Sequence, residues 1–139
     1  MKLISLGIAL AMICGTSSGL RGQERATKRK VFYFPIGAET LTPVTSSNIE
    51  QRGRFCEIRS TKNIYTIKNA LDSAVSPLSQ KFSDLTVRVK LIEATDMGDK
   101  LLAVVENDGE VRFATGKEAI ISPRGMKAIK KVIETQCQK

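Results

Sequence analysis

The chain contains no histidine. It therefore cannot form a Ser–His or Cys–His nucleophile pair, an imidazole general base or the HExxH motif of metalloproteases. No two cysteines have Cys-x-x-Cys spacing, which argues against a thioredoxin-type redox pair and a structural zinc site. Neither a Ser-x-x-Lys motif nor a glycine-rich phosphate loop occurs. These absences predict a protein that is not an enzyme and that has no cofactor.

Carboxylates are the remaining candidates for chemistry, and they cluster near predicted turns. Asp96 and Asp99 flank one turn, and Glu106, Asp108 and Glu110 flank the next. Their spacing does not match the calcium loop of an EF-hand, and Asp is common in turns for backbone reasons alone. We expect no metal site and no catalytic residue among them. The alternative is a catalytic pair of carboxylates that no sequence motif marks.

The first residues have the layout of a secretory signal peptide. Lys2 precedes an apolar run, Leu3–Ile13, and small residues follow at 15–19. The run is shorter than the roughly 20 residues that a membrane-spanning helix needs. We expect cleavage near Ser18 or Gly19, so that residues 1–19 form the signal. A short signal of this kind is typical of bacterial export, which predicts a periplasmic location.

Cys14 provides an alternative, because a lipoprotein signal places a lipidated Cys after a short apolar run. The residue before that Cys is normally small, whereas Ile13 is not. Lipidation of Cys14 would make the protein an outer-membrane lipoprotein, and contact with the membrane is expected only in that case.

Cys56 and Cys137 remain after removal of the signal, and an even pair in an exported protein predicts a disulfide. The bridge would close a loop long enough to stabilise the fold by about 4 kcal/mol in the chain-entropy model. Periodicity supports the same pairing. Cys56 alternates onto the same strand face as Ile58, and Cys137 follows the apolar side of the last helix with Met126, Ile129, Val132 and Ile133.

The rest of the chain predicts one α+β domain over residues 31–139, preceded by a flexible basic N-terminus over residues 20–30. The expected strands are 31–34, 54–59, 85–92, 101–105 and 111–114. The expected helices are a short one at 48–52, capped by Ser46 or Ser47, a longer one from Ser60 or Thr61 to Ser76, and a last one from Pro123.

The resulting order is β-α-β-α-β-β-β-α. It predicts a mainly antiparallel sheet of about five strands with a three-stranded C-terminal meander and two helices packed on one face. The apolar stripe of the longer helix is expected to include Ala74 and Val75. The first strand is apolar on both sides, which predicts that both its faces are covered, by a helix or by a partner protein.

Polar residues between the first strand and the second form the candidate binding surface, because conspicuous polar loops on a rigid scaffold often bind partners. They are Glu39, Thr40, Thr42, Glu50, Arg52 and Arg54. With a net charge of +8, the chain suits an acidic protein partner, and export argues against nucleic acid. The sequence thus predicts a small exported binding protein of the inhibitor or immunity type. The alternative is an envelope-associated structural or surface protein that contacts anionic lipid or cell-wall polymer.

Overall fold

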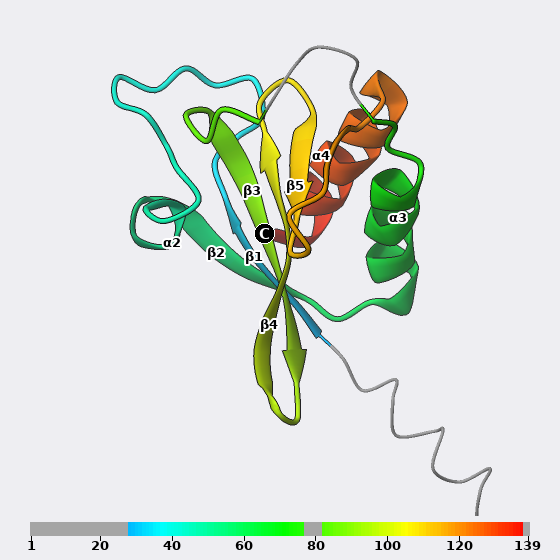
Figure 1. Cartoon of the computed structure of the whole chain (residues 1–139). Helices are drawn as coiled ribbons and strands as arrows, with labels where there is room; N and C mark the ends of the chain where they lie inside the picture. Colours follow the sequence, from blue (N-terminus) through cyan, green and yellow to red (C-terminus); the bar gives the residue numbers. More distant parts are fainter. Residues whose placement is uncertain (1–27, 77–81, 138–139) are drawn as a thin grey trace, which may run out of the picture.

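The computed structural model describes residues 28–76 and 82–137, which form one antiparallel sheet with three helices (Figure 1). The strands are β1 (Lys28–Tyr33), β2 (Arg54–Ile58), β3 (Val87–Thr95), β4 (Gly98–Glu106), β5 (Glu110–Phe113) and β6 (Glu118–Ile120); the helices are α2 (Ile49–Arg52), α3 (Thr61–Asp72) and α4 (Pro123–Cys137). The predicted α+β class is confirmed. The predicted signal peptide and Cys14 lie outside the described residues.

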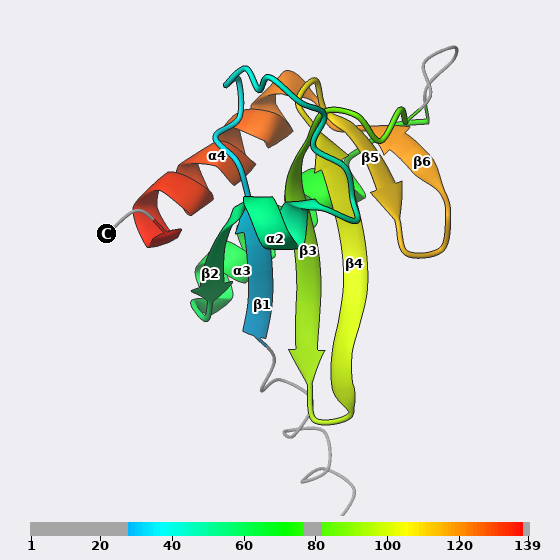
Figure 2. The same ribbon diagram turned by 90° about the vertical axis from the view of Figure 1, so that its left-hand side faces the viewer.

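The sheet has the order β2-β1-β3-β4-β5-β6, and Figure 2 looks onto one of its faces. Strands β1, β3 and β4 begin at other residues than predicted, and a sixth strand is present. Strand β1 begins at Lys28, so residues 28–30 belong to the sheet and not to the predicted flexible N-terminus, because they pair with β2 and β3. Strand β6 was not predicted. It spans only three residues, which is too short for an alternation of apolar and polar residues to predict a strand, and it forms by pairing with β5.

Strand β1 is covered on both faces, as its sequence predicts, although the side chains on the α2 side are only partly buried. Val31 and Tyr33 are 0% and 2% exposed and belong to the main core under α3 and α4. Phe32 and Phe34 point to the opposite side and pack on a smaller core that includes Ile49 of α2. We call the side that carries α3 and α4 the helix face, and the side that carries α2 the α2 face (Figure 1).

Helix α3 begins as predicted, because the Ser60 side chain accepts a hydrogen bond from the backbone N–H of Asn63. It buries Ile67, Ala70 and Leu71 but ends at Asp72. The predicted stripe was therefore wrong at Val75, which is 65% exposed. Val75 instead forms a β-bridge with Ile120, which occupies its backbone groups outside the helix.

Helix α4 also begins where the sequence predicts. The Ser122 hydroxyl accepts from the backbone N–H of Gly125, and Pro123 is the first helical residue. Gly125 has a packing role, because a Cβ there would lie 2.7 Å from a methyl carbon of Ile121 and 3.4 Å from the Cβ of Ala70. Small residues at this point let α3 and α4 approach closely.

The meander was predicted correctly in outline but not in side-chain direction. The sequence places Leu85, Val87, Val89 and Leu91 on one side of a strand, yet Leu85 is 54% exposed and β3 starts at Val87. A register shift between Val87 and Val89 turns Val87 to the α2 face, while Val89 and Leu91 stay in the main core. Such a bulge reverses the alternation that a regular strand would keep.

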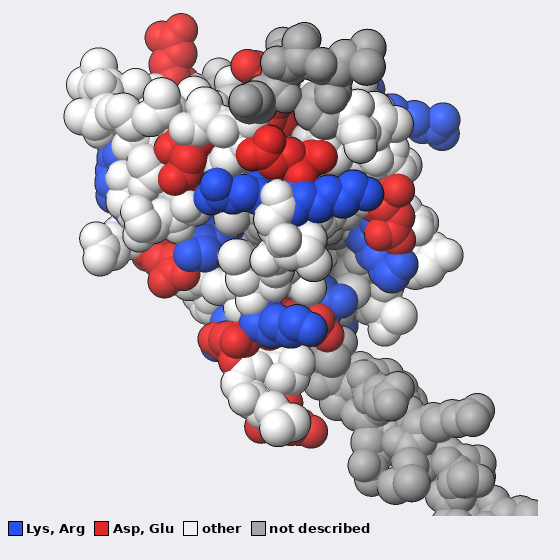
Figure 3. All heavy atoms as spheres, viewed as in Figure 1, with Lys and Arg blue, Asp and Glu red and all other residues white. Residues whose placement is uncertain are grey.

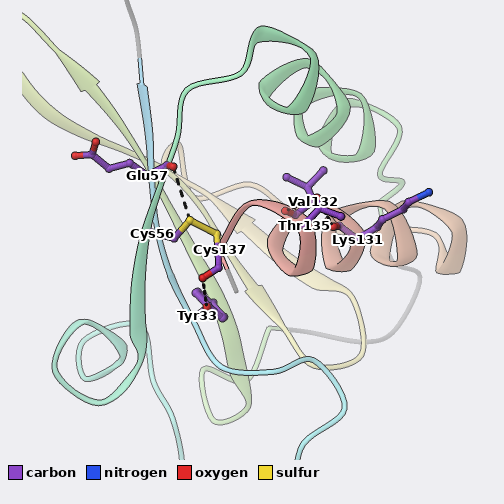
Figure 4. The surroundings of a disulfide bond; sticks show 7 residues. All are labelled: Tyr33, Cys56, Glu57, Lys131, Val132, Thr135 and Cys137. Carbon is purple, nitrogen blue, oxygen red and sulfur yellow. Dashed lines mark hydrogen bonds between the residues drawn. A yellow bond between two sulfur atoms is a disulfide. The ribbon is translucent and has the colours of Figure 1, made fainter. Parts of the chain in front are cut away.

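The predicted disulfide between Cys56 and Cys137 is present, with the two Cα atoms 5.4 Å apart and a sequence separation of 81. Figure 4 shows how it joins β2 to the last turn of α4, next to Tyr33. The Tyr33 hydroxyl donates to the Cys137 carbonyl over 3.5 Å. The bridge thus ties the C-terminal end of α4 to the edge of the sheet.

Replacing both bridge cysteines, Cys56→Ser with Cys137→Ser, should lower the free energy of unfolding by about 2–4 kcal/mol, because the unfolded chain gains the entropy of a long open loop. Hydrogen exchange should show the last turn of α4 opening first. Adding reductant to the oxidised wild type should reproduce this loss, whereas the double variant should not respond to reductant. Alkylation of two free thiols in the untreated mature protein would contradict the pairing.

Candidate functional site

The loop 35–47 and helix α2 stand on the α2 face of the sheet (Figures 1 and 2). This segment contains most of the residues that the sequence singled out for partner binding. Helix α2 is held by Ile49, which is fully buried against Val44, Val87 and Val104. It ends at Gly53 as predicted, but neither Ser46 nor Ser47 caps it. Asn48 is the N-cap residue, and its side-chain oxygen accepts from the backbone N–H of Thr45.

The first part of the loop is fixed to the strands behind it. The backbone N–H of Gly37 donates to the Asn107 side chain over 2.7 Å. Arg88 is 4% exposed and donates from Nη2 to the Ala38 carbonyl over 2.8 Å. Burial lowers the pKa of Arg88, but this pKa lies so far above neutrality that the guanidinium stays charged. Two side chains thus fix the backbone of residues 37 and 38.

The second part of the loop is fixed by α2 and by the segment before β3. Arg52 donates to the Pro43 carbonyl over 2.7 Å and lies 5.9 Å from the centre of the Phe34 ring. The Asp84 carboxylate accepts from the backbone N–H of Ser46 over 2.7 Å and from its hydroxyl over 3.2 Å. Lys90 donates to the Ser46 carbonyl as well. The loop is therefore held at both ends, on either side of residues 39–42.

Glu106 of β4 fixes the segment that contains Asp84. It is 1% exposed, and its carboxylate accepts four hydrogen bonds, from the backbone N–H and the hydroxyl of both Ser83 and Thr86. These bonds hold Asp84 in a left-handed conformation, with φ 59°, that directs its carboxylate to Ser46. Burial alone would raise the pKa of Glu106, but the hydrogen bonds outweigh it and lower the pKa below its usual value.

The tip of the loop is the part that these contacts leave at the surface. Glu39, Leu41 and Thr42 are exposed there, and Thr40 is half-buried. Leu41 has an exposed fraction of 106%, which means that its side chain touches almost nothing else in the described chain. A large apolar side chain presented on a loop with fixed ends is the feature that sequence reasoning missed. Only its position between polar candidates could have pointed to it.

The six predicted binding residues thus divide into two groups. Glu39, Thr40 and Thr42 surround Leu41 at the tip, whereas Glu50 and Arg52 lie on α2, and Arg54 begins β2. Glu50 forms an ion pair with Lys90 over 2.8 Å, and Arg52 fixes Pro43, so both have structural roles. The structure does not gather all six at one point. Only the first three share the exposed tip.

A hollow of about 340 Å³ lies beside the loop, over the part of the sheet that α2 leaves uncovered. Ser46 and Ser47 form one side, and Lys90 and Arg112 lie within it. The other side is formed by Phe113, Ala114 and Gly116. Arg112 also lies 4.6 Å from the centre of the Phe82 ring. On edge strand β2, two strands away from Lys90 in the sheet, Phe55 is 52% exposed and stacks at an angle on Phe32. The α2 face thus offers basic and aromatic side chains next to the loop.

No known protein family matches this sequence, and comparison with curated proteins and with solved structures gives no match either. Over residues 28–76 and 82–137, no helix is both long and apolar enough to cross a membrane. Within the same ranges, no group of three or more Cys, Asp and Glu side chains could hold a metal ion.

Replacing Glu106 by Gln should lower the free energy of unfolding at neutral pH by about 1–3 kcal/mol, because an amide nitrogen would face the Ser83 and Thr86 donors. A lowered folded-state pKa stabilises the protein above the ordinary carboxyl pKa of 4.5, and this stability is lost as the pH falls from 4.5 through the folded value. Urea melts at neutral and acidic pH should show a smaller acid loss for Glu106→Gln than for the wild type. Glu134→Gln, at an exposed position on α4, should leave both melts unchanged.

Proposed function

We propose that this protein is an exported, non-catalytic binding protein of the inhibitor or immunity type, and that the tip of the 35–47 loop enters a cleft of a protein partner. The observation that carries the proposal is the exposure of Leu41 on a loop whose two ends are fixed. Burying a Leu side chain on binding contributes about 1.5–3 kcal/mol. An apolar residue that fills a partner's pocket, surrounded by polar contacts, is a common centre of binding energy.

The fixed ends of the loop favour tight binding. A mobile loop would lose conformational entropy on association, and that loss would subtract from the affinity. Here Arg88, Arg52 and Asp84 already restrict the backbone on both sides of the tip. The loop can therefore present Leu41 and its polar neighbours in nearly the same arrangement before and after binding.

The charge of the protein supports an acidic partner. The whole chain has a net charge of +8. Figure 3 shows acidic and basic side chains interspersed on the side that it displays, with no extended area of one sign. The positive net charge would therefore act over the whole molecule, mainly by speeding association with an acidic partner. Affinity would then come from the loop tip, and Arg112 on the α2 face would help to orient the partner.

Leu41→Asp should abolish retention of the partner from a periplasmic extract passed over the immobilised protein, because a carboxylate cannot enter an apolar pocket without a large desolvation cost. Met97→Asp is the matched control. Met97 is 98% exposed at the tip of the β3–β4 hairpin, and its replacement should leave retention unchanged. Equal retention by the two variants, or no protein retained by the wild type at low salt, would refute the proposal.

The export part of the proposal is tested separately by mass spectrometry of the mature protein from its native host. A free N-terminus near residue 19 or 20 is expected from cleavage of the predicted signal. A lipid-modified Cys14 would instead support the envelope-associated alternative. An intact Met1 would overturn export, and the Cys56–Cys137 bridge would then need an oxidising environment of another kind.

A further inference from the structure

Helices α3 and α4 lie side by side on the helix face, and a shallow groove runs between them (Figure 1). The groove consists of two hollows of about 470 Å³ and about 370 Å³, which share Thr66 and Ala128 and are therefore continuous. In the described part of the chain no strand residue lines either hollow, so the groove is turned away from the sheet.

The groove is positively charged. Lys62 and Lys131 lie at one end of it, and Arg124 lies at the other. Over residues 28–76 and 82–137, no Asp or Glu lines either hollow, and no carboxylate lies within ion-pair distance of these three cations. The carboxylates of the two helices, Asp72 and Glu134, both lie outside the groove. An anionic ligand would therefore be attracted here without a competing acidic group.

Hydroxyl groups along the groove favour a ligand that also donates hydrogen bonds. The hydroxyls of Thr66, Ser73 and Thr135 all donate to carbonyls about one turn earlier in the chain, over 3.0, 3.1 and 2.9 Å. In this arrangement their oxygens can serve a ligand only as acceptors. A peptide backbone supplies N–H donors for them, whereas ionised phosphates only accept. Among the described residues no aromatic side chain lines the groove, so it offers no stacking surface for nucleic-acid bases.

The length of the groove suits a short extended peptide. Lys62 and Ser73 mark the two ends of its α3 side, about 16 Å apart at a helical rise of about 1.5 Å per residue. An extended chain rises by about 3.3 Å per residue, so about five residues span this length. Arg124 and Lys131 are about 10 Å apart along α4, and carboxylates about three positions apart would reach both.

We propose that the groove between α3 and α4 binds an extended acidic peptide segment. The carboxylates of the segment lie at Lys62, Arg124 and Lys131, and its backbone N–H groups donate to the hydroxyl oxygens along the groove. The proposal goes beyond the partner contact through Leu41, because α3 and α4 cover the opposite face of the sheet from the 35–47 loop. The two surfaces can therefore bind independently.

The direct test is a titration of the protein with a capped hexa-aspartate peptide at low ionic strength, followed by backbone amide NMR signals. Saturable shifts are expected for Asn63, Thr66, Ala128 and Lys131. They should disappear in roughly 1 M salt, where the screening length falls to about 3 Å. A capped hexa-asparagine peptide, which lacks the charges, should bind at least about tenfold more weakly. The absence of saturable hexa-aspartate shifts would overturn the proposal, and so would shifts confined to residues outside the groove.

Exposed lysines supply a matched pair of double variants. Lys62→Gln with Lys131→Gln removes two charges from the groove, and Lys100→Gln with Lys130→Gln removes two exposed charges that lie outside it. The first variant should weaken hexa-aspartate binding by about tenfold and the second by less than about twofold, because exposed ion pairs act locally. If the first variant loses no more affinity than the second, net charge alone accounts for binding and the proposal is wrong.

A hexa-aspartate peptide with methylated backbone nitrogens tests the assignment to a peptide. It keeps the carboxylates but cannot donate to Thr66, Ser73 and Thr135. Its affinity should be about tenfold lower, and equal affinity would overturn the assignment because any polyanion would then bind as well. Leu41→Asp should leave hexa-aspartate binding unchanged, so that this proposal and the proposed partner contact can fail separately.

Discussion

The need to cover both apolar faces of strand β1 is the constraint on which the rest of the structure depends. Val31 and Tyr33 need an apolar cover on one side, and Phe32 and Phe34 need one on the other. Helices α3 and α4 cover the first side. On the second side the cover is shorter, because only α2 and the loop before it are available. Two helices therefore cover one face of the sheet, whereas part of the α2 face stays exposed.

Polar contacts give the short cover on the α2 face its rigidity. A four-residue helix buries only Ile49, which is too little apolar area to fix a long loop. The loop is held instead through hydrogen bonds of buried charged side chains, above all Arg88 to Ala38 and Glu106 to Ser83 and Thr86. Buried polar groups of this kind stabilise one arrangement because every alternative would leave them without partners. Because these contacts fix the loop only on either side of residues 39–42, Leu41 stays exposed between them.

Much of the fold follows from local sequence patterns. The end of α2 at Gly53 and the start of α4 at Ser122–Pro123 agree with the sequence, because caps and breakers act through neighbouring residues. The Asp108–Gly109 turn does too: Gly109 has φ 101°, and a Cβ there would lie 2.9 Å from the Ile121 carbonyl oxygen. The predictions were wrong where contacts between residues far apart in the chain determine the local structure. The bulge at Arg88 and the bridge that ends α3 before Val75 both depend on pairing with other strands.

The fold class, most helix and strand positions and the Cys56–Cys137 pairing follow from local patterns alone, since periodicity places both cysteines on inner faces. The composition of the candidate loop was also readable. Tertiary structure alone decided that Glu50 and Arg52 hold the loop while Leu41 is exposed, because that division depends on which residues Lys90 and Pro43 meet across the fold. It likewise decided that Lys62, Arg124 and Lys131 line one groove between α3 and α4. Contacts between residues far apart in the chain depend on packing, and local patterns do not encode them.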